Sequence, residues 1–461
     1  MPNFTSDTGQ LLSRDVQRYL LQGIASVSNA TFVRRQCRPD PNAKWLWNTT
    51  EILQDLEIPQ YDWMRVYSWS DLSLSPPPVE IPVVVPNQSE YIFDIPVSIM
   101  KVHWSKAIAL SPHLAQYKKA GSDVMLDELF LTRALLKDKH VLLLSHVFVD
   151  NWGLVVHPES CMAFRNGACH PATKPFAAKP TSSYPLVITI ATSWTGTWHF
   201  PMEDLVGLAY IDEGIASKAV IHVPYTSLYL EKWLLAIGVE RGRIVTGAIG
   251  AQVLLVPQLA MCGKPFPSQL TWLREKVLLL LSHAVLSLDR NHSTINHPLL
   301  LSQPSNQTSS PKALMVFIER SDVRDLKSPQ KLMLKSVVLS FARQHHIRVA
   351  IHDGRSDAQS IVQQVEPFSG ASIVVGEHGA GLLFAAFAPR DVCIIEISSA
   401  RNPLCYARLA YLLKQHYIML HFQDIETDKK TLRAALSKCH GALKTQQQQQ
   451  QRFEEESRKR E

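Results

Sequence analysis

The chain has 461 residues, of which 46% are hydrophobic and 19% charged, and its formal net charge at pH 7 is +6. This composition excludes fibrous and disordered proteins, and so small a positive charge on so long a chain gives no reason to expect nucleic-acid binding. The length leaves room for two or three domains.

Residues 1–100 are expected to form an irregular N-terminal appendage. Proline is dense here, and "LSPPPVEIPVVVPNQ" at 74–88 is typical of an extended tether. The N-terminus lacks the layout of a signal peptide, and the chain has no run of 18 uncharged apolar residues. These features alone indicate a cytosolic protein.

The asparagines indicate a different compartment. Six of the eleven asparagines lie in N-x-[ST] motifs, where chance predicts about two. Four lie in the first 90 residues and two in a polar linker, which are surface contexts in which a glycan can be attached. We therefore predict the lumen of the Golgi or endoplasmic reticulum, with a membrane anchor upstream of Met1. The predicted glycosylation sites are Asn3, Asn29, Asn48, Asn87, Asn291 and Asn306.

Seven cysteines are too few for a disulfide scaffold. Cys161 and Cys169 enclose a turn-rich loop, and a bridge between them would stabilise the fold by roughly 2–3 kcal/mol. A metal site that adds His157 and His170 is the alternative, although the spacing matches no known zinc motif. The other five cysteines have apolar neighbours and are expected to be free core thiols.

Residues 101–288 are predicted to form a first α/β domain. Short β-like runs come first, and strands alternate with helices from residue 184 onward, which is typical of βαβ units and a parallel sheet. In this second part the expected strands are 184–192 and 218–224, and the expected helices are 198–215 and 227–238.

A polar, proline-broken linker is predicted at 289–312, followed by a second α/β domain at 313–440. The expected strands are 313–319, 347–353, 371–377 and 392–398, with helices expected at 329–345 and 357–370. The low-complexity tail at 441–461 is expected to be disordered or a frayed helix.

The segment "GEHGAGLLFAAFAPRDVCIIEI" at 376–397 interrupts the second domain with three glycines and a histidine. Gly376 ends a predicted strand, and Gly379 and Gly381 flank Ala380 where a helix begins. Glycines let backbone N–H groups approach a ligand, and a helix N-terminus favours an anion, so phosphate is the expected ligand. The alternative is that the glycines only make a tight turn. The spacing is neither a dinucleotide fingerprint nor a Walker loop.

This segment resembles the signature of glycosyltransferase family 61, with its HGAGL loop, apolar helix and short strand ending in glutamate. Supporting similarities lie in "FIERSDVRDL" at 317–326, "NPLCYARLAYLLKQHYIML" at 402–420 and "WTGTWHFPMEDLVGLAYID" at 194–212. The resemblance spans about 190–420. It implies a GT-B-like α/β fold, in which two Rossmann-like domains face a cleft. In this chain an irregular N-terminal appendage is expected to precede the two domains, and a disordered C-terminal tail is expected to follow them.

The resemblance implies an inverting glycosyltransferase of the secretory pathway. It would move N-acetylglucosamine, xylose or arabinose from a UDP-sugar to a hydroxyl of a glycoprotein or polysaccharide. It implies no cofactor and no obligatory metal, in keeping with the lack of an Asp-x-Asp motif. Membrane contact would come only from an anchor missing from this chain. Leu383 and Glu377 depart from the family pattern, which leaves a catalytically inactive sugar-nucleotide- or glycan-binding protein as the alternative.

Arg320 and Arg324 are expected to clamp the donor diphosphate, because arginine binds phosphate in a bidentate manner. The alternative is a charged loop in which nearby aspartates pair with them. Glu396 is expected to accept a ribose hydroxyl, or else to be an exposed carboxylate at a strand end. The other predicted donor-site residues are His378, Gly379, Ala380 and Gly381.

His199 and Glu203 are four residues apart, which places them on one face of a helix. A histidine–carboxylate pair can abstract a proton, and we expect Glu203 to be the base and His199 to orient it. The alternative is a core histidine tied to its own helix.

Overall fold

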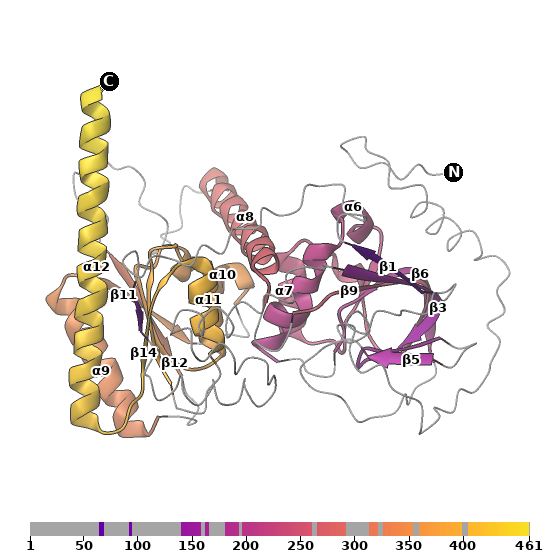
Figure 1. Cartoon of the computed structure of the whole chain (residues 1–461), viewed down its shortest axis with the longest axis horizontal. Helices are drawn as coiled ribbons and strands as arrows, with labels where there is room; N and C mark the ends of the chain where they lie inside the picture. Colours follow the sequence, from indigo (N-terminus) through magenta and orange to yellow (C-terminus); the bar gives the residue numbers. More distant parts are fainter. Residues whose placement is uncertain are drawn as a thin grey trace, which may run out of the picture. The chain divides into compact units, whose positions relative to one another are not determined.

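The computed structural model describes residues 64–68, 92–94, 140–157, 162–165, 180–192, 196–260, 265–291, 313–320, 326–353, 359–398 and 404–460. The chain divides into two compact units (Figure 1). Unit 1 comprises Met1–Pro82 and Arg133–Lys276, and unit 2 comprises Val83–Thr132 and Val277–Glu461. Each unit has one sheet packed with helices, so the predicted mixed α/β, Rossmann-like class is confirmed. Within the described ranges, no helix is long and apolar enough to cross a membrane.

The unit 1 sheet has eight strands in the order β5-β4-β3-β9-β6-β7-β8, with β1 paired to β3. β9, β6, β7 and β8 run parallel to one another, whereas β3 is antiparallel to β9. The parallel half is therefore the βαβ part that the alternating pattern predicts. The strands are β1 (Met64–Ser68), β3 (His140–Val149), β4 (Leu154–His157), β5 (Met162–Arg165), β6 (Ser182–Thr189), β7 (Val220–His222), β8 (Ile244–Val245) and β9 (Ile249–Pro257).

The predicted helix at 198–215 is broken into three short turns. A π-helical turn leads into a 3-10 helix, and α6 then begins where Asp212 caps the N–H groups of Gly214 and Ile215. The helices of unit 1 are η4 (Phe200–Asp204), η5 (Leu205–Tyr210), α6 (Glu213–Ala216), α7 (Leu228–Ala236) and η6 (Arg241–Arg243).

Helix α8 (Pro267–Asn291) contains the boundary between the two units. It continues to Asn291 and so includes the first three residues of the predicted linker. A polar helix end has the same composition as a linker, so the sequence does not separate the two. Asn291 is thus the last residue of a helix, and the other five predicted glycosylation sites lie outside the described residues.

The unit 2 sheet is parallel throughout and has the strand order β11-β10-β12-β13-β14-β2. Counted along the chain from β10, the first five strands have the order 2-1-3-4-5, which is the flavodoxin-like order. The four strands predicted for this domain are confirmed. The strands are β2 (Phe93–Asp94), β10 (Leu314–Glu319), β11 (Arg348–Asp353), β12 (Ile373–Glu377), β13 (Cys393–Ile397) and β14 (His416–Leu420).

Helices cover both faces of this sheet (Figure 1). On one face α9 (Ser328–Gln344) and α12 (Ile425–Arg460) pack on alternate strand residues such as Phe317, Val375 and Ile395. The other face carries α10 (Ile361–Ser369) and α11 (Cys405–Leu413), and η7 (Ala380–Phe387) contacts both of these helices. Of the two expectations for the tail, the structure shows the helix, because α12 continues through the tail to Arg460, and the expected disorder is not confirmed.

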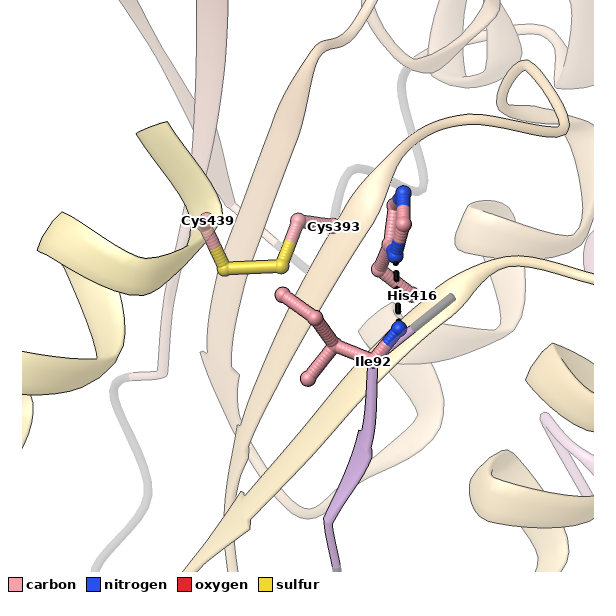
Figure 2. Close-up of a disulfide and its surroundings, with 4 residues drawn as sticks. All are labelled: Ile92, Cys393, His416 and Cys439. Carbon is pink, nitrogen blue, oxygen red and sulfur yellow. Dashed lines mark hydrogen bonds between the residues drawn. A yellow bond between two sulfur atoms is a disulfide. The ribbon is translucent and has the colours of Figure 1, made fainter. Parts of the chain in front are cut away.

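A disulfide joins Cys393 of β13 to Cys439 of α12 (Figure 2). The prediction of free thiols is therefore wrong for these two residues, whereas the buried Cys405 is free as predicted. The bridge spans 46 residues of sequence, and such a pairing cannot be deduced from sequence alone. The expected partners Cys161 and Cys169, and also His170, lie outside the described residues.

The predicted appendage contributes one strand to each sheet. β1 pairs antiparallel with β3, and β2 pairs parallel with β14. Beside β2 the backbone N–H of Ile92 donates to Nδ1 of His416 at 2.8 Å (Figure 2). An imidazole nitrogen that accepts a hydrogen bond is unprotonated, and burial lowers the pKa of His416 accordingly.

Candidate functional site

The strand order of unit 2 reverses between β10 and β12. In open α/β sheets, ligands bind at the carboxyl ends of the strands beside such a switch point. Arg320 directly follows β10 and His378 directly follows β12. A guanidinium N–H of Arg320 donates to the carbonyl oxygen of His378. The structure therefore brings two predicted donor-site residues together at the edge of the sheet where a ligand is expected.

Two glycines of the loop are required by close contacts inside the protein. A Cβ on Gly376 would lie 2.9 Å from Cβ of Ile318, its neighbour in register on β10. A Cβ on Gly379 would overlap the guanidinium of Arg320, with Cζ only 2.6 Å away. The tight turn that the alternative interpretation proposed is thus present. At Gly379 the close contact is with Arg320, the residue that is predicted to bind phosphate.

The loop is held by hydrogen bonds on both sides. The N–H of His378 donates to the carbonyl oxygen of Ile397 at 2.7 Å, and the hydroxyl of Tyr406 donates to that of Gly379 at 2.5 Å. Ala380 begins η7, an eight-residue 3-10 helix in which Gly381 is buried. The backbone from 378 to 381 therefore enters the helix in one defined conformation.

Glu396 of β13 lies behind the loop and binds His378. Nδ1 of His378 is 2.6 Å from one carboxylate oxygen of Glu396, and the hydroxyl of Tyr417 donates to the other at 2.5 Å. Glu396 is 0% exposed, so the alternative of an exposed strand-end carboxylate is wrong. Burial raises the pKa of Tyr417 well above its usual value, and its phenol therefore stays protonated as a donor.

An ionised carboxylate can only accept, so the proton of this contact lies on Nδ1 of His378. Nε2 is then the ring atom that remains for a ligand, and the side chain of His378 is 15% exposed. Both oxygens of Glu396 are engaged by protein groups, and its expected contact with ribose stays a prediction.

Three residues of this site were not predicted from the sequence: Tyr406, Tyr417 and Lys331. Tyr417 occupies an otherwise apolar strand, which is a weak signal for a buried hydroxyl with a partner. Nζ of Lys331 lies 3.4 Å from a carboxylate oxygen of Glu377 and donates to the carbonyl oxygen of Arg320 at 3.2 Å. Lys331 is one of two lysines on α9, and the sequence does not distinguish it from the other.

Helix α11 places a buried cation in unit 2. Arg408 is 4% exposed, and burial lowers the pKa of its guanidinium to about 9. The sequence signal for this buried charge was an arginine inside an apolar helix, because arginine is almost never fully buried without a structural or ligand-binding reason.

Unit 1 carries a comparable histidine–glutamate pair. Nδ1 of His199 lies 2.8 Å from a carboxylate oxygen of Glu203, and the side chains are 28% and 4% exposed. The pair follows β6, and the N–H of Ala260, just after β9, donates to the carbonyl oxygen of Glu203. β6 and β9 flank the switch point of this sheet. The predicted pairing is confirmed, but the histidine is the member that meets solvent.

A second carboxyl group lies directly beside this pair. Asp204 is buried and accepts hydrogen bonds from the hydroxyl of Thr192 at 3.1 and 3.2 Å. Burial, followed by the neighbouring charge of Glu203, raises the pKa of Asp204 well above its usual value. Asp204 therefore favours its neutral form.

Arg324, the other arginine predicted to bind the diphosphate, lies outside the described residues. Across the described parts of the chain, no group of three or more histidine, cysteine or acidic side chains could hold a metal ion. A comparison with models of known protein families gave no match, and a comparison with curated protein sequences gave none either.

Proposed function

We propose that the chain is an inverting glycosyltransferase that uses a UDP-sugar donor, with the donor diphosphate at the switch point of unit 2. The observation that carries the proposal is the contact between Arg320 and the loop at His378. A guanidinium and a glycine loop that opens a helix are both groups that bind phosphate. The proposal includes the GT-B arrangement, in which the two units face a cleft.

In this proposal unit 2 stabilises the leaving group. Arg320 neutralises charge as the bond between the sugar and UDP breaks. Glu396 holds Nδ1 of His378, so that Nε2 is the ring nitrogen that contacts the donor in this proposal. A ring fixed in this way contacts a phosphate oxygen without the entropy loss of ordering a free side chain.

Unit 1 provides the base. The acceptor oxygen attacks the anomeric carbon, and its proton passes to His199 as the bond to UDP breaks. The exposures of 28% for His199 and 4% for Glu203 favour the histidine as the base and the carboxylate as its support. This reverses the roles expected from the sequence.

The Cys393–Cys439 disulfide supports the proposed compartment. Disulfides persist in oxidising compartments such as the endoplasmic reticulum, and the six N-x-[ST] motifs point to the same compartment. Treating the secreted protein with an N-glycosidase tests this assignment, because loss of glycans lowers its mass. An unchanged mass would remove the main support for a luminal protein.

A binding protein without turnover is the second candidate. Leu383 is 0% exposed and belongs to the core of η7, so it supplies no polar contact to a ligand. A panel of UDP-sugars separates the two candidates when hydrolysis and thermal stabilisation are measured together. Hydrolysis or transfer with one sugar supports the enzyme. Stabilisation without turnover, even with added acceptor glycans, supports the binding protein.

A further inference from the structure

Glu377 places a buried negative charge beside the loop that is proposed to bind the diphosphate. It is the last residue of β12, directly before His378, and its side chain is 4% exposed. It is in register with Ile397, which belongs to the core beneath α9 and α12. The carboxylate therefore lies on the face of the sheet that α9 covers.

Lys331 of α9 reaches this carboxylate. Its Nζ lies 3.4 Å from Oε1 of Glu377 and donates to the carbonyl oxygen of Arg320 at 3.2 Å. One ammonium group thus joins the ends of β10 and β12 on both sides of the switch point. The Lys331 side chain is 19% exposed, so solvent screens this pair only weakly.

One turn further along α9, Lys335 pairs with Glu319 at 2.7 Å. These side chains are 37% and 44% exposed, and exposed pairs of this kind contribute little to stability or to the local field. The helix thus offers a buried ion pair beside the loop and an exposed pair of the same residue types for comparison.

We infer that Lys331 is a positioning residue for a nucleoside diphosphate: it compensates the charge of Glu377 and holds the backbone of Arg320. The inference rests on the proposed function. A diphosphate beside an uncompensated buried carboxylate is repelled, because charges interact more strongly where the dielectric constant is low. The ion pair removes this repulsion without placing Lys331 on the ligand.

The test measures UDP binding by titration calorimetry and folding by thermal melting. Lys331→Met should weaken UDP binding by about tenfold or more, because Glu377 then loses the ion pair with Lys331. Adding Glu377→Gln to that variant should restore most of the affinity. Glu377→Gln alone should bind UDP at least as tightly as the wild type, and Lys335→Met should bind like the wild type.

Unchanged UDP binding in Lys331→Met would overturn the inference, and so would weaker binding in Glu377→Gln. Failure of the second substitution to restore affinity would also overturn it. If Lys331→Met does not fold, Glu377→Gln alone decides, because it removes the negative charge beside the loop and keeps Lys331. A wild type that binds no UDP would contradict the proposed function itself, which separates the two failures.

Discussion

Nδ1 of His378 lies 2.6 Å from a carboxylate oxygen of Glu396, a residue that is completely buried. The contact joins the loop after β12 to the neighbouring strand β13. It fixes the orientation of the imidazole and leaves Nε2 as the ring nitrogen for a ligand. In the proposed donor site the carboxylate would act on the ligand through the histidine.

Glu396→Gln should weaken UDP binding by about tenfold to a hundredfold, since a charge-assisted hydrogen bond contributes about 1.5–3 kcal/mol. Tyr417→Phe is the matched control, because it removes the other hydrogen bond to Glu396 and keeps the one to His378. Its effect on UDP binding should be clearly smaller. Titration calorimetry measures both, and equal effects would show that the buried network acts only on folding.

Gly379→Ala should displace the guanidinium of Arg320, because the new methyl group would occupy its position. We expect UDP binding to fall by about tenfold while the fold is kept, since a flexible side chain can move aside. Gly370→Ala is the control, because nothing lies within 4 Å of that added Cβ. If both variants bind UDP like the wild type, Arg320 does not need its observed position.

His199→Gln should lower turnover by about a hundredfold or more with little change in donor binding, because it removes the proposed base. Glu203→Gln should lower turnover less, by about tenfold, because it removes only the support of the ring. Steady-state kinetics with a saturating donor compares them. A larger loss in Glu203→Gln would restore the roles expected from the sequence, and no loss in either would make the pair structural.

Acid should destabilise the protein through His222. Its ring donates to the carbonyl oxygen of Gly247 at 2.8 Å and accepts from the hydroxyl of Thr189 at 3.0 Å, which requires the neutral form. Burial lowers its pKa to about 4 from 6.5. Below pH 6.5 the unfolded chain binds a proton that the folded chain refuses, so stability falls until about pH 4.

Between pH 6.5 and pH 4, His222 lowers the free energy of unfolding by about 3 kcal/mol in total. Denaturant unfolding at a series of pH values measures it, and His222→Gln should reduce the slope of unfolding free energy between pH 4 and 6.5. Some slope should remain, because burial also lowers the pKa of His352 to about 4. An identical slope in the variant would show that His222 is not the group that titrates.

The strands β6 and β7 of unit 1 and β10 to β13 of unit 2 could be predicted, because each is a short apolar run between turn residues. The switch-point loop could also be predicted, since glycine and histidine interrupt an apolar segment. These are local signals, and they required no knowledge of which strands are neighbours.

The remaining features depend on contacts between distant parts of the chain. The Cys393–Cys439 bridge and the strand β2 on the edge of the second sheet join segments whose pairing no local pattern shows. The buried position of Glu396 depends in part on the distant strand β14, whose Tyr417 donates to its carboxylate. The helical tail differs from these features because its signal is local. Glu454, Glu455 and Glu456 each precede a basic residue by four positions, which favours a helix.

The most direct test of the account is a UDP titration of the wild type and Arg320→Ala. The wild type should bind UDP, and the variant should bind it about ten to a hundred times more weakly with an unchanged melting temperature, because one charge-assisted bond to phosphate is lost. Arg348→Ala is the control, since this exposed arginine begins β11 at the opposite edge of the sheet. A wild type that does not bind UDP, or an Arg320→Ala variant with wild-type affinity, would contradict a donor site at this switch point.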